Sequence, residues 1–247
     1  MPHSGSTLLD TCLGCHADLI SMGEVWSVIQ KMKWERQDVC TCGQAVGQCP
    51  VWAHIWALFQ RYNHTPVLED TAYNMVPSVV SNLYGPDKAI VDSSKYIEPL
   101  KKRIGHPGLK VIFLKREVEG YVHSMREKNH GVIRGNPAYL ARQWSVGNRG
   151  FTELIRENSL DALTVSYDQL CGEPEMTMKK ICQFLGISYS EKMIIPANNT
   201  SSHMIHSNRL LRSPEKLKSI RYDESWSQHS VVSWLARSVS NYVEKRQ

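Results

Sequence analysis

The chain has 247 residues, 42% of them hydrophobic, which is enough for one large core, so we expect a single domain over residues 1–247. A formal net charge of +5, with no dense basic block beyond residues 101–103, disfavours nucleic acid as a partner. No apolar run reaches the roughly 18 residues of a membrane helix, and no signal sequence opens the chain, so we expect a cytoplasmic protein without a transmembrane segment.

The first residues, PHSGST, form a turn rich in Gly and Ser that runs into an apolar helix. Backbone N–H groups at a helix start point outward, and the helix dipole adds partial positive charge there, which favours an anion. Ser4, Ser6 and Thr7 add hydroxyl donors, and Gly5 lets the backbone approach closely. The alternative is an ordinary helix N-cap at Ser4 or Ser6. Gly-Lys occurs nowhere in the chain, so a Walker A loop for nucleoside triphosphates is disfavoured.

The helix after this turn carries a second pattern, because Cys12-Leu13-Gly14-Cys15-His16 has the spacing of a c-type haem attachment site. The seven cysteines of the chain are an odd number and are unevenly distributed. Reduced thiols are the default inside the cell, whereas haem attachment belongs to exported proteins. We therefore expect Cys12 and Cys15 to lie on one face of the helix that follows the loop, without haem.

The segment CTCGQAVGQCPVW brings Cys40, Cys42 and Cys49 close together in sequence, with His54 nearby. Four such side chains can bind zinc. The alternative is a Gly-rich loop with small buried thiols. Cys-x-Cys is less typical of structural zinc than Cys-x2-Cys, so the sequence favours the loop without metal.

Short apolar runs then alternate with longer amphipathic segments, which predicts an α/β fold. Strands are expected within AIVDSSK (89–95), LKVIFLKR (109–116) and ALTVSY (162–167). Helices are expected at about residues 117–127, 138–158, 174–185 and 228–246. Open α/β sheets bind ligands at the carboxyl ends of their strands, so the polar residues that end these runs are candidate site residues.

Arg116 closes the clearest strand, and Ser124 lies eight residues on, two turns into the next helix. Both side chains can reach one phosphate. A lone Arg at a strand end is more often solvated or paired at the surface. The pair therefore indicates a phosphate site only in combination with the other motifs of the chain.

Four motifs occur in the order seen in sulfotransferases that use 3′-phosphoadenosine 5′-phosphosulfate: PHSGSTL, the Arg116-x7-Ser124 pair, VSYDQLCGEPEMTMKKICQFLGI and SNRLLR. The chain resembles that family over nearly its whole length. The resemblance implies a P-loop-like three-layer α/β sandwich with a central parallel sheet. It implies 3′-phosphoadenosine 5′-phosphosulfate (PAPS) as the co-substrate, with no metal required. Bacterial-type members of the family also carry Cys-x-Cys-Gly loops similar to the one that contains Cys40 and Cys42.

The resemblance also implies roles for individual residues. The loop from His3 to Thr7 would hold the 5′-phosphosulfate, and Arg116 and Ser124 would hold the 3′-phosphate. Tyr167 would approach the adenine. A late loop would close over the cofactor with Asn208, Arg209 and Arg212.

Sulfuryl transfer needs a base beside the acceptor and positive charge beside the leaving 5′-phosphate. The family usually carries Lys or Arg where this chain has His3, so either His3 is protonated by the phosphates or Lys95 takes over that role. Gly23-Glu24 resembles the pair that supplies the base in the tyrosylprotein branch of the family, which makes Glu24 the predicted base. A cap on a helix over residues 25–33 is the alternative role for Glu24. The alternative bases are His16, His54 and His123.

The family's phosphosulfate loop follows a central strand, whereas this sequence starts at the loop, so we expect the first strand of the sheet to be missing. Two other functions stay open: an inactive relative that binds the nucleotide or zinc, and a P-loop phosphoryl transferase. The acceptor is expected to carry a hydroxyl or amine on a small molecule, a carbohydrate or a peptide. Four aromatic residues lie in the segment where acceptor pockets of the family form, but aromatics at such spacings more often belong to the core, and this is the interpretation favoured for Trp26, Trp52, Trp56 and Tyr73.

Overall fold

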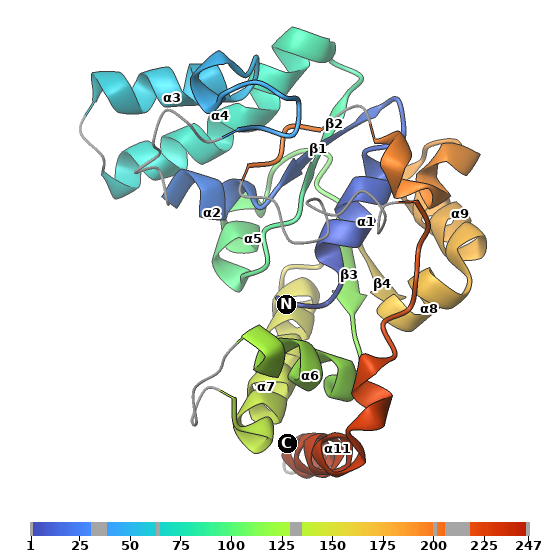
Figure 1. The fold of residues 1–247 in the computed structure, drawn as a ribbon. Coiled ribbons are helices and arrows are strands. Elements are labelled where there is room, and N and C mark those ends of the chain that lie inside the picture. The colour runs from blue at the N-terminus through green and yellow to red at the C-terminus, as the bar shows by residue number, and fades with distance from the viewer. Residues whose placement is uncertain are drawn as a thin grey trace. The chain divides into compact units, whose positions relative to one another are not determined.

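A computed structural model describes residues 2–30, 39–62, 65–128, 135–199, 202–205 and 218–245 (Figure 1). These residues form two compact units, each assembled from separate stretches of the chain. Unit 1 comprises residues 1–6, 96–187 and 221–247, and unit 2 comprises residues 7–95 and 188–220. Strand pairing is parallel in both units, which confirms the α/β prediction. The strands fall into two two-stranded sheets, one in each unit, across the described ranges.

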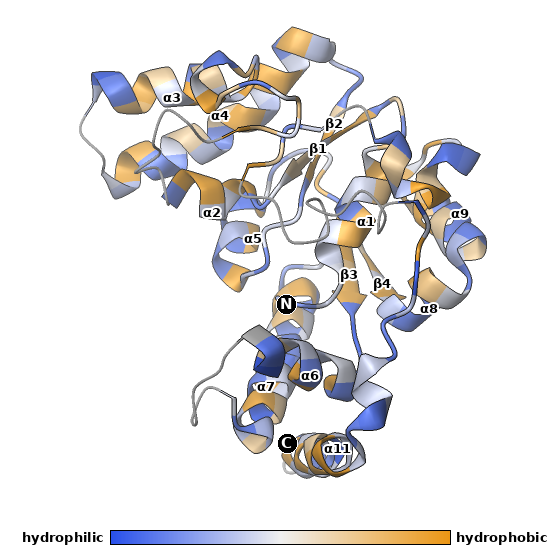
Figure 2. Cartoon of the chain, in the orientation of Figure 1, coloured by the Kyte–Doolittle hydropathy of each residue, from blue (hydrophilic) through white to orange (hydrophobic). Residues whose placement is uncertain are grey.

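Unit 1 is built on β3 (Val111–Lys115) and β4 (Ala162–Ser166), which pair in register from Val111 opposite Ala162 to Lys115 opposite Ser166. Both strands are hydrophobic along most of their length (Figure 2). The helices of unit 1 are α5 (Ile97–Arg103), α6 (Val118–Lys128), α7 (Pro137–Glu157), α8 (Tyr167–Gly172), α9 (Pro174–Leu185), the 3-10 turn η4 (Ser225–Gln228) and α11 (Ser230–Lys245).

Local signals explain why the helices of unit 1 lie where the sequence predicted them. Helix α7 starts at Asn136, whose side chain accepts hydrogen bonds from the backbone N–H groups of Ala138 and Tyr139. Helix α9 has Pro174 in its first turn and ends at Gly186, whose φ of +77° only glycine adopts readily. Helices α6, α7 and α11 enclose a hydrophobic cluster of Val118, Tyr121, Val122, Leu140, Ala141, Trp144 and Ala236.

Unit 2 is built on β1 (Leu19–Gly23) and β2 (Ala89–Asp92), which start their parallel pairing at Leu19 opposite Ala89. The helices are α1 (Ser6–Leu13), which begins at the last residue of unit 1, α2 (Val25–Gln30), α3 (Trp52–Arg61) and α4 (Pro66–Tyr84), with the 3-10 turns η1 (Val46–Gln48), η2 (Glu191–Ile194) and η3 (Pro196–Asn198). The sequence analysis missed β1, whose five residues are all buried but include Ser, Met and Gly, and so show neither alternation nor a long apolar run.

The core of unit 2 contains aromatic residues that the sequence also considered for an acceptor pocket. Trp26, Trp52 and Tyr73 are buried in this core, and Trp56 packs against it. The ring of Tyr73 meets the ring of Trp26 edge-on, with centroids 5.3 Å apart. The interpretation of these residues as core is therefore confirmed. None of the described helices is long and apolar enough to cross a membrane.

Candidate functional site

Three of the predicted anion-binding residues meet in unit 1. Nδ1 of His3 lies 2.7 Å from Oγ of Ser124, and Arg116 donates a long hydrogen bond of 3.4 Å to the His3 carbonyl. Arg116 follows the carboxyl end of β3, and Ser124 lies on α6. The structure therefore places His3 of the N-terminal loop beside the Arg-x7-Ser pair, although the sequence assigned the loop and the pair to different phosphates of the donor.

The guanidinium of Arg116 is held on several sides, and the side chain is only 8% exposed. It donates a hydrogen bond of 2.8 Å to Asp223 and lies over the Tyr167 ring, 4.6 Å from the centroid. A Cβ atom at Gly120 would lie 2.7 Å from Nε of Arg116, so this glycine makes room for the guanidinium. These contacts fix the position of the Arg116 guanidinium.

Gly120, Asp223 and the contact of Tyr167 with Arg116 were not predicted from the sequence. Gly120 follows Arg116 by four residues, so the Arg-x3-Gly spacing was a readable signal. Asp223 lies 107 residues from Arg116 in the sequence, and no local pattern could pair them. Tyr167, which was expected near the adenine, contacts Arg116 and lies 5.9 Å from the Tyr222 ring, centroid to centroid.

Burial and hydrogen bonding decide the charge of the two ionisable groups that contact Arg116, Asp223 and Tyr167. Burial would raise the pKa of Asp223, but hydrogen bonds from Ser225 and Arg116 outweigh it and hold the pKa below its ordinary value. Asp223 is therefore ionised at neutral pH. Burial raises the pKa of Tyr167 well above its ordinary value, so its ring faces Arg116 as a neutral phenol.

The loop itself has two features that suit an anion. Gly5 has a φ of +92°, and a Cβ atom there would lie 2.4 Å from the Tyr167 ring, so only glycine fits. Oγ of Ser6 is buried and has no hydrogen-bond partner within the described part of the chain. A buried hydroxyl without a partner is costly unless a ligand supplies one. Ser4 is buried beside these residues, and Thr7 is the first residue of unit 2, on α1.

The two predicted catalytic residues of unit 2 form an ion pair. Glu24 directly follows β1, and Lys95 comes three residues after the end of β2. Nζ of Lys95 donates a hydrogen bond of 2.5 Å to Oε1 of Glu24, while the second carboxylate oxygen lies 3.4 Å from Oγ of Ser27. Parallel strands bring their carboxyl ends to one edge, which explains this meeting.

The secondary structure before Glu24 differs from the one expected from the sequence. The sequence placed it one short turn after the loop helix, but strand β1 lies between that helix and Glu24. Helix α2 is described from Val25 to Gln30, and residues 31–33 of the expected helix lie outside the described residues.

The histidines considered as alternative bases have other contacts. His16 accepts a hydrogen bond of 3.1 Å from the backbone N–H of Asp18, and Nδ1 of His54 lies 2.9 Å from the Pro50 carbonyl oxygen. The His123 ring stacks on the His229 ring with centroids 5.0 Å apart. The predicted cofactor-loop residues Asn208, Arg209 and Arg212 lie outside the described residues.

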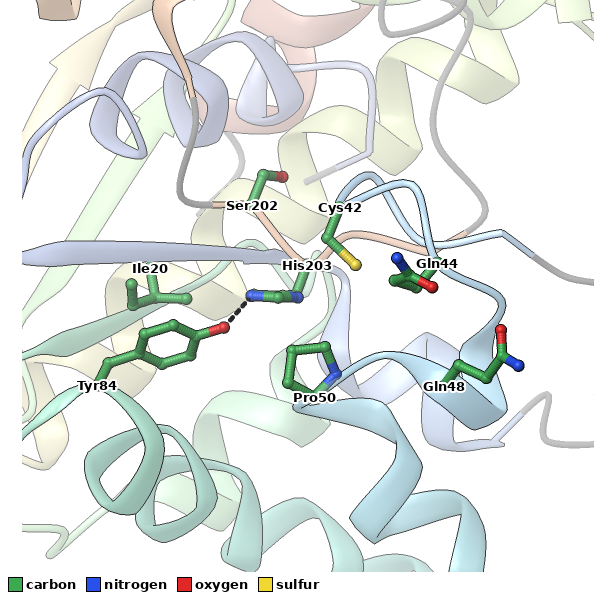
Figure 3. Close-up of a pocket in the computed structure, with 8 residues that line it drawn as sticks. All are labelled: Ile20, Cys42, Gln44, Gln48, Pro50, Tyr84, Ser202 and His203. Atoms are coloured by element: carbon green, nitrogen blue, oxygen red, sulfur yellow. Dashed lines mark hydrogen bonds between the residues drawn. The ribbon is translucent and has the colours of Figure 1, made fainter.

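The fold of unit 2 shows where the cysteines of both sequence patterns lie. The side chain that joins Cys40, Cys42 and Cys49 is His203. The zinc alternative considered from the sequence had His54 as the fourth side chain, and the structure corrects that choice. A pocket of about 510 Å³ lies beside this cluster, with Cys42, Tyr84 and His203 in its lining (Figure 3). In the haem-like pattern, Cys12 is a buried residue of α1, as expected. Cys15 is buried in the turn that follows, because the helix ends at Leu13, and this corrects its expected place on the helix face.

Comparison with known proteins agrees with the fold and the motifs. Residues 1–191 match the sequence model of the sulfotransferase family. A candidate protein-tyrosine sulfotransferase of Caenorhabditis briggsae is 21% identical over 200 residues, which span 78% of this chain and 66% of that protein. The alignment thus covers slightly less than two thirds of the relative.

Two solved structures share the fold. The sulfotransferase domain of the Synechococcus PCC 7002 olefin synthase superposes with a TM-score of 0.57 at 21% identity, over 96% of this chain and 90% of that domain. The sulfotransferase domain from the curacin biosynthetic pathway gives a TM-score of 0.54 at 16% identity, over 98% and 94%. The chain belongs to the sulfotransferase family, which confirms the resemblance that its sequence motifs indicated.

Proposed function

We propose that this protein transfers a sulfuryl group from PAPS to a hydroxyl or amine acceptor. The observation that carries the proposal is the meeting of Arg116, Ser124 and His3 beside the N-terminal loop of unit 1. The family membership supports the reaction class, and the cluster supports an anionic nucleotide as the donor.

Arg116 and Ser124 would hold the 3′-phosphate of the donor. A guanidinium has five N–H donors in a planar fork, so the hydrogen bond to Asp223 leaves others for a phosphate. The Asp223 side chain is 43% exposed and can turn towards water when a second anion arrives. The contact between His3 and Ser124 favours a place for His3 in the same phosphate subsite.

The loop from Ser4 to Thr7 would hold the 5′-phosphosulfate. Its two fitting features are the backbone at Gly5, which accepts no side chain, and the buried hydroxyl of Ser6. The PAPS molecule supplies the activated sulfuryl group. The backbone N–H groups at the start of α1 would stabilise the negative charge that develops on the 5′-phosphate oxygen.

Glu24 would accept the proton of the acceptor, with Lys95 orienting its carboxylate. The bond from sulfur to the acceptor oxygen or nitrogen forms as the bond from sulfur to the 5′-phosphate oxygen breaks. Adenosine 3′,5′-bisphosphate is the leaving group, and the proton passes to Glu24. Because Lys95 donates to Oε1, the other carboxylate oxygen is the better placed to take the proton.

The similarity to a candidate protein-tyrosine sulfotransferase makes a peptide tyrosine hydroxyl the first acceptor to test, before sugars and amines. We expect a cytoplasmic location for this reaction. Transfer is measured with a sulfur-labelled donor across these acceptor classes. Nucleotide binding without transfer to any of them would support an inactive relative instead.

Binding of adenosine 3′,5′-bisphosphate tests the site directly. A charged, forked contact to phosphate contributes about 1.5–3 kcal/mol, so Arg116→Ala should weaken binding by more than about tenfold in calorimetry. Arg116→Lys keeps the positive charge but loses the forked pair of N–H donors, so its affinity should lie between those of the wild type and Arg116→Ala. Ser124→Ala should cost less than Arg116→Ala, because a neutral hydroxyl is the weaker donor. Unchanged affinity in Arg116→Ala would remove Arg116 from the site and with it the support for this donor.

A further inference from the structure

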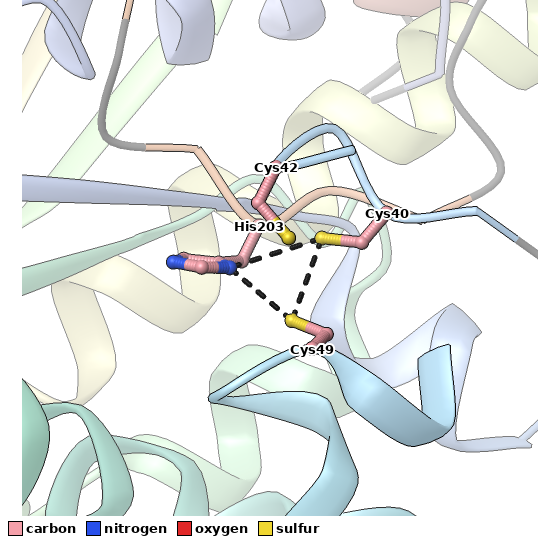
Figure 4. Close-up of side chains that lie close together, drawn as sticks. All are labelled: Cys40, Cys42, Cys49 and His203. Atoms are coloured by element: carbon pink, nitrogen blue, oxygen red, sulfur yellow. Dashed lines mark hydrogen bonds between the residues drawn. The ribbon is translucent and has the colours of Figure 1, made fainter. Parts of the chain in front are cut away.

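Four side chains with metal-binding atoms converge in unit 2: Cys40, Cys42, Cys49 and His203 (Figure 4). Their sulfur and nitrogen atoms all lie within 4.8 Å of one another. Cys40, Cys49 and His203 are buried, and Cys42 is the most accessible member. None of the four takes part in the anion site or the Glu24–Lys95 pair.

The three distances among Cys40, Cys49 and His203 are close to the edges of a tetrahedral metal site. With zinc–sulfur bonds of about 2.3 Å and zinc–nitrogen bonds of about 2.0 Å, neighbouring ligand atoms lie roughly 3.5–3.8 Å apart. Sγ of Cys49 lies 3.6 Å from Sγ of Cys40, and Nδ1 of His203 lies 3.8 Å from Cys40 and 3.2 Å from Cys49. A disulfide needs about 2.05 Å between its sulfurs, so Cys40 and Cys49 are two separate thiols.

The backbone holds the ligands in place from two segments far apart in the sequence. In the cysteine loop, the N–H of Cys40 donates to the Gln44 carbonyl at 2.9 Å, and Gly43, with a φ of +85°, makes the turn. His203 is fixed by hydrogen bonds from its own N–H to the Ser21 carbonyl and from the Trp52 indole to its carbonyl, at 2.7 Å and 2.5 Å. A site built on fixed backbone needs little rearrangement to bind a metal.

The second ring nitrogen of His203 has a hydrogen-bond partner outside the cluster. Nε2 of His203 lies 2.6 Å from the hydroxyl oxygen of Tyr84. When Nε2 donates its proton to this oxygen, Nδ1 carries the lone pair that faces the cysteines. Metal-binding histidines are held in the same way, with the second ring nitrogen bonded to a nearby oxygen.

We propose that Cys40, Cys42, Cys49 and His203 bind one Zn²⁺ ion in a closed, structural tetrahedral site. Three thiolates and one imidazole form a donor set typical of structural zinc, and four protein ligands leave no coordination position for a substrate. The ion would tie residues 202–205 to the loop of residues 40–49. The pocket lined by Cys42 and His203 provides an entry path for the metal (Figure 3). From the sequence alone, the Cys-x-Cys spacing favoured thiols without metal. The structure adds His203 as a fourth ligand, and the complete set of four ligands favours a bound metal instead.

Elemental analysis of the full chain, purified without added metal or chelator, tests the proposal. We expect about one zinc per chain in the wild-type protein and a loss of zinc in Cys42→Ser, since Cys42 is the accessible ligand and its replacement disturbs packing least. Cys42→His should restore binding, because imidazole is also a zinc ligand. The matched control is His54→Ala, which removes the nearby histidine outside the cluster and should leave the zinc content unchanged.

A graded variant separates a bound ion from a merely packed cluster. Tyr84→Phe removes the outer partner of His203 and should weaken zinc affinity by about 10- to 100-fold in competition with a chromogenic chelator. Replacement of the metal by Co²⁺ should give the visible absorption of tetrahedral coordination, with thiolate charge-transfer bands in the near ultraviolet.

The proposal fails if the wild-type protein contains no zinc and shows no such Co²⁺ spectrum, if iron is found in place of zinc, or if His54→Ala removes the metal and Cys42→Ser does not. If Cys42→Ser is insoluble, the wild-type zinc content and Co²⁺ spectrum still decide the question. Neither readout depends on the proposed donor or on sulfuryl transfer.

Discussion

The two units gather their candidate functional residues by different routes. In unit 1, Arg116 and Ser124 are eight residues apart, at a strand end and two turns into the next helix, and both contact His3. In unit 2, Lys95 is 71 residues from Glu24. A short local motif therefore predicted the first meeting, whereas the second depends on the parallel pairing of β1 with β2.

The candidate functional residues of the two units also differ in burial and in their partners. Arg116 in unit 1 is buried, stacked on an aromatic ring and paired with Asp223, so its position is set by packing. Glu24 in unit 2 is more accessible, with 35% of its side chain exposed, and its main partner is a single lysine. We expect substitutions in unit 1 to change binding, and substitutions at Glu24 to change turnover.

The largest expected effect is on turnover in Glu24→Gln. A general base contributes roughly 10²- to 10⁴-fold to a rate, so turnover should fall by that much while cofactor affinity and melting temperature stay nearly constant. Steady-state kinetics with calorimetry and thermal melting separate these quantities. The matched control is Glu175→Gln, which breaks the exposed Glu175–Lys179 ion pair and should leave the rate unchanged.

Lys95→Met sharpens the same test. If Lys95 acts only through Glu24, the double variant should lose no more activity than Glu24→Gln alone. Lower stability with turnover nearly kept in Glu24→Gln would instead identify Glu24 as a helix-capping residue.

The second expected effect concerns the stability of unit 2. Burial raises the pKa of Asp10 to about 7, although hydrogen bonds from Ser21 and Ser93 act to lower it. The unfolded chain loses this proton near its ordinary pKa of 3.8, so between about pH 4 and 7 the folded protein binds more protons and its free energy of unfolding falls as the pH rises. The slope is about 1.4 kcal/mol per pH unit, with a total of up to about 4 kcal/mol.

Asp10→Asn should remove this slope, because the amide stays neutral and its oxygen can still accept the hydrogen bond from Ser21. Denaturant unfolding from pH 4 to 7 should show the variant gaining stability relative to wild type as the pH rises. Asp18→Asn is the opposite control, because the hydrogen bond from Lys88 lowers the pKa of Asp18 and its contribution to stability is lost at low pH. A difference between wild type and Asp10→Asn that does not vary with pH would contradict the buried acid.

The smallest expected effect is at Gly120. Alanine there should stabilise helix α6 by about 0.5–1 kcal/mol, but its Cβ would push on Nε of Arg116. The loss of one hydrogen bond to the phosphate corresponds to about 0.5–1.5 kcal/mol, so adenosine bisphosphate should bind roughly two- to tenfold more weakly. Gly172→Ala is the matched control, because a Cβ atom there meets nothing within 4 Å. Equal binding in the two variants would show that Gly120 does not position Arg116.

Sequence patterns determined the features that depend on neighbouring residues. Caps and turn residues such as Asn136, Pro174 and Gly186 set helix ends within the chain itself, so helices α6, α7, α9 and α11 were predicted to within about two residues. The Gly- and Ser-rich loop and the Arg-x7-Ser pair were also recognisable in the sequence, because the loop is one short stretch and two helical turns fix the spacing of the pair.

Only the tertiary structure decided which distant side chains meet. Strand β1 is short and buried over its whole length, so it carried no periodic signal, yet its pairing with β2 brings Glu24 to Lys95. Asp223 reaches Arg116 across 107 residues, and His203 reaches Cys49 across 154 residues. Such contacts arise because burying apolar surface folds the chain back on itself, and the side chains that then lie next to one another have no fixed spacing in the sequence.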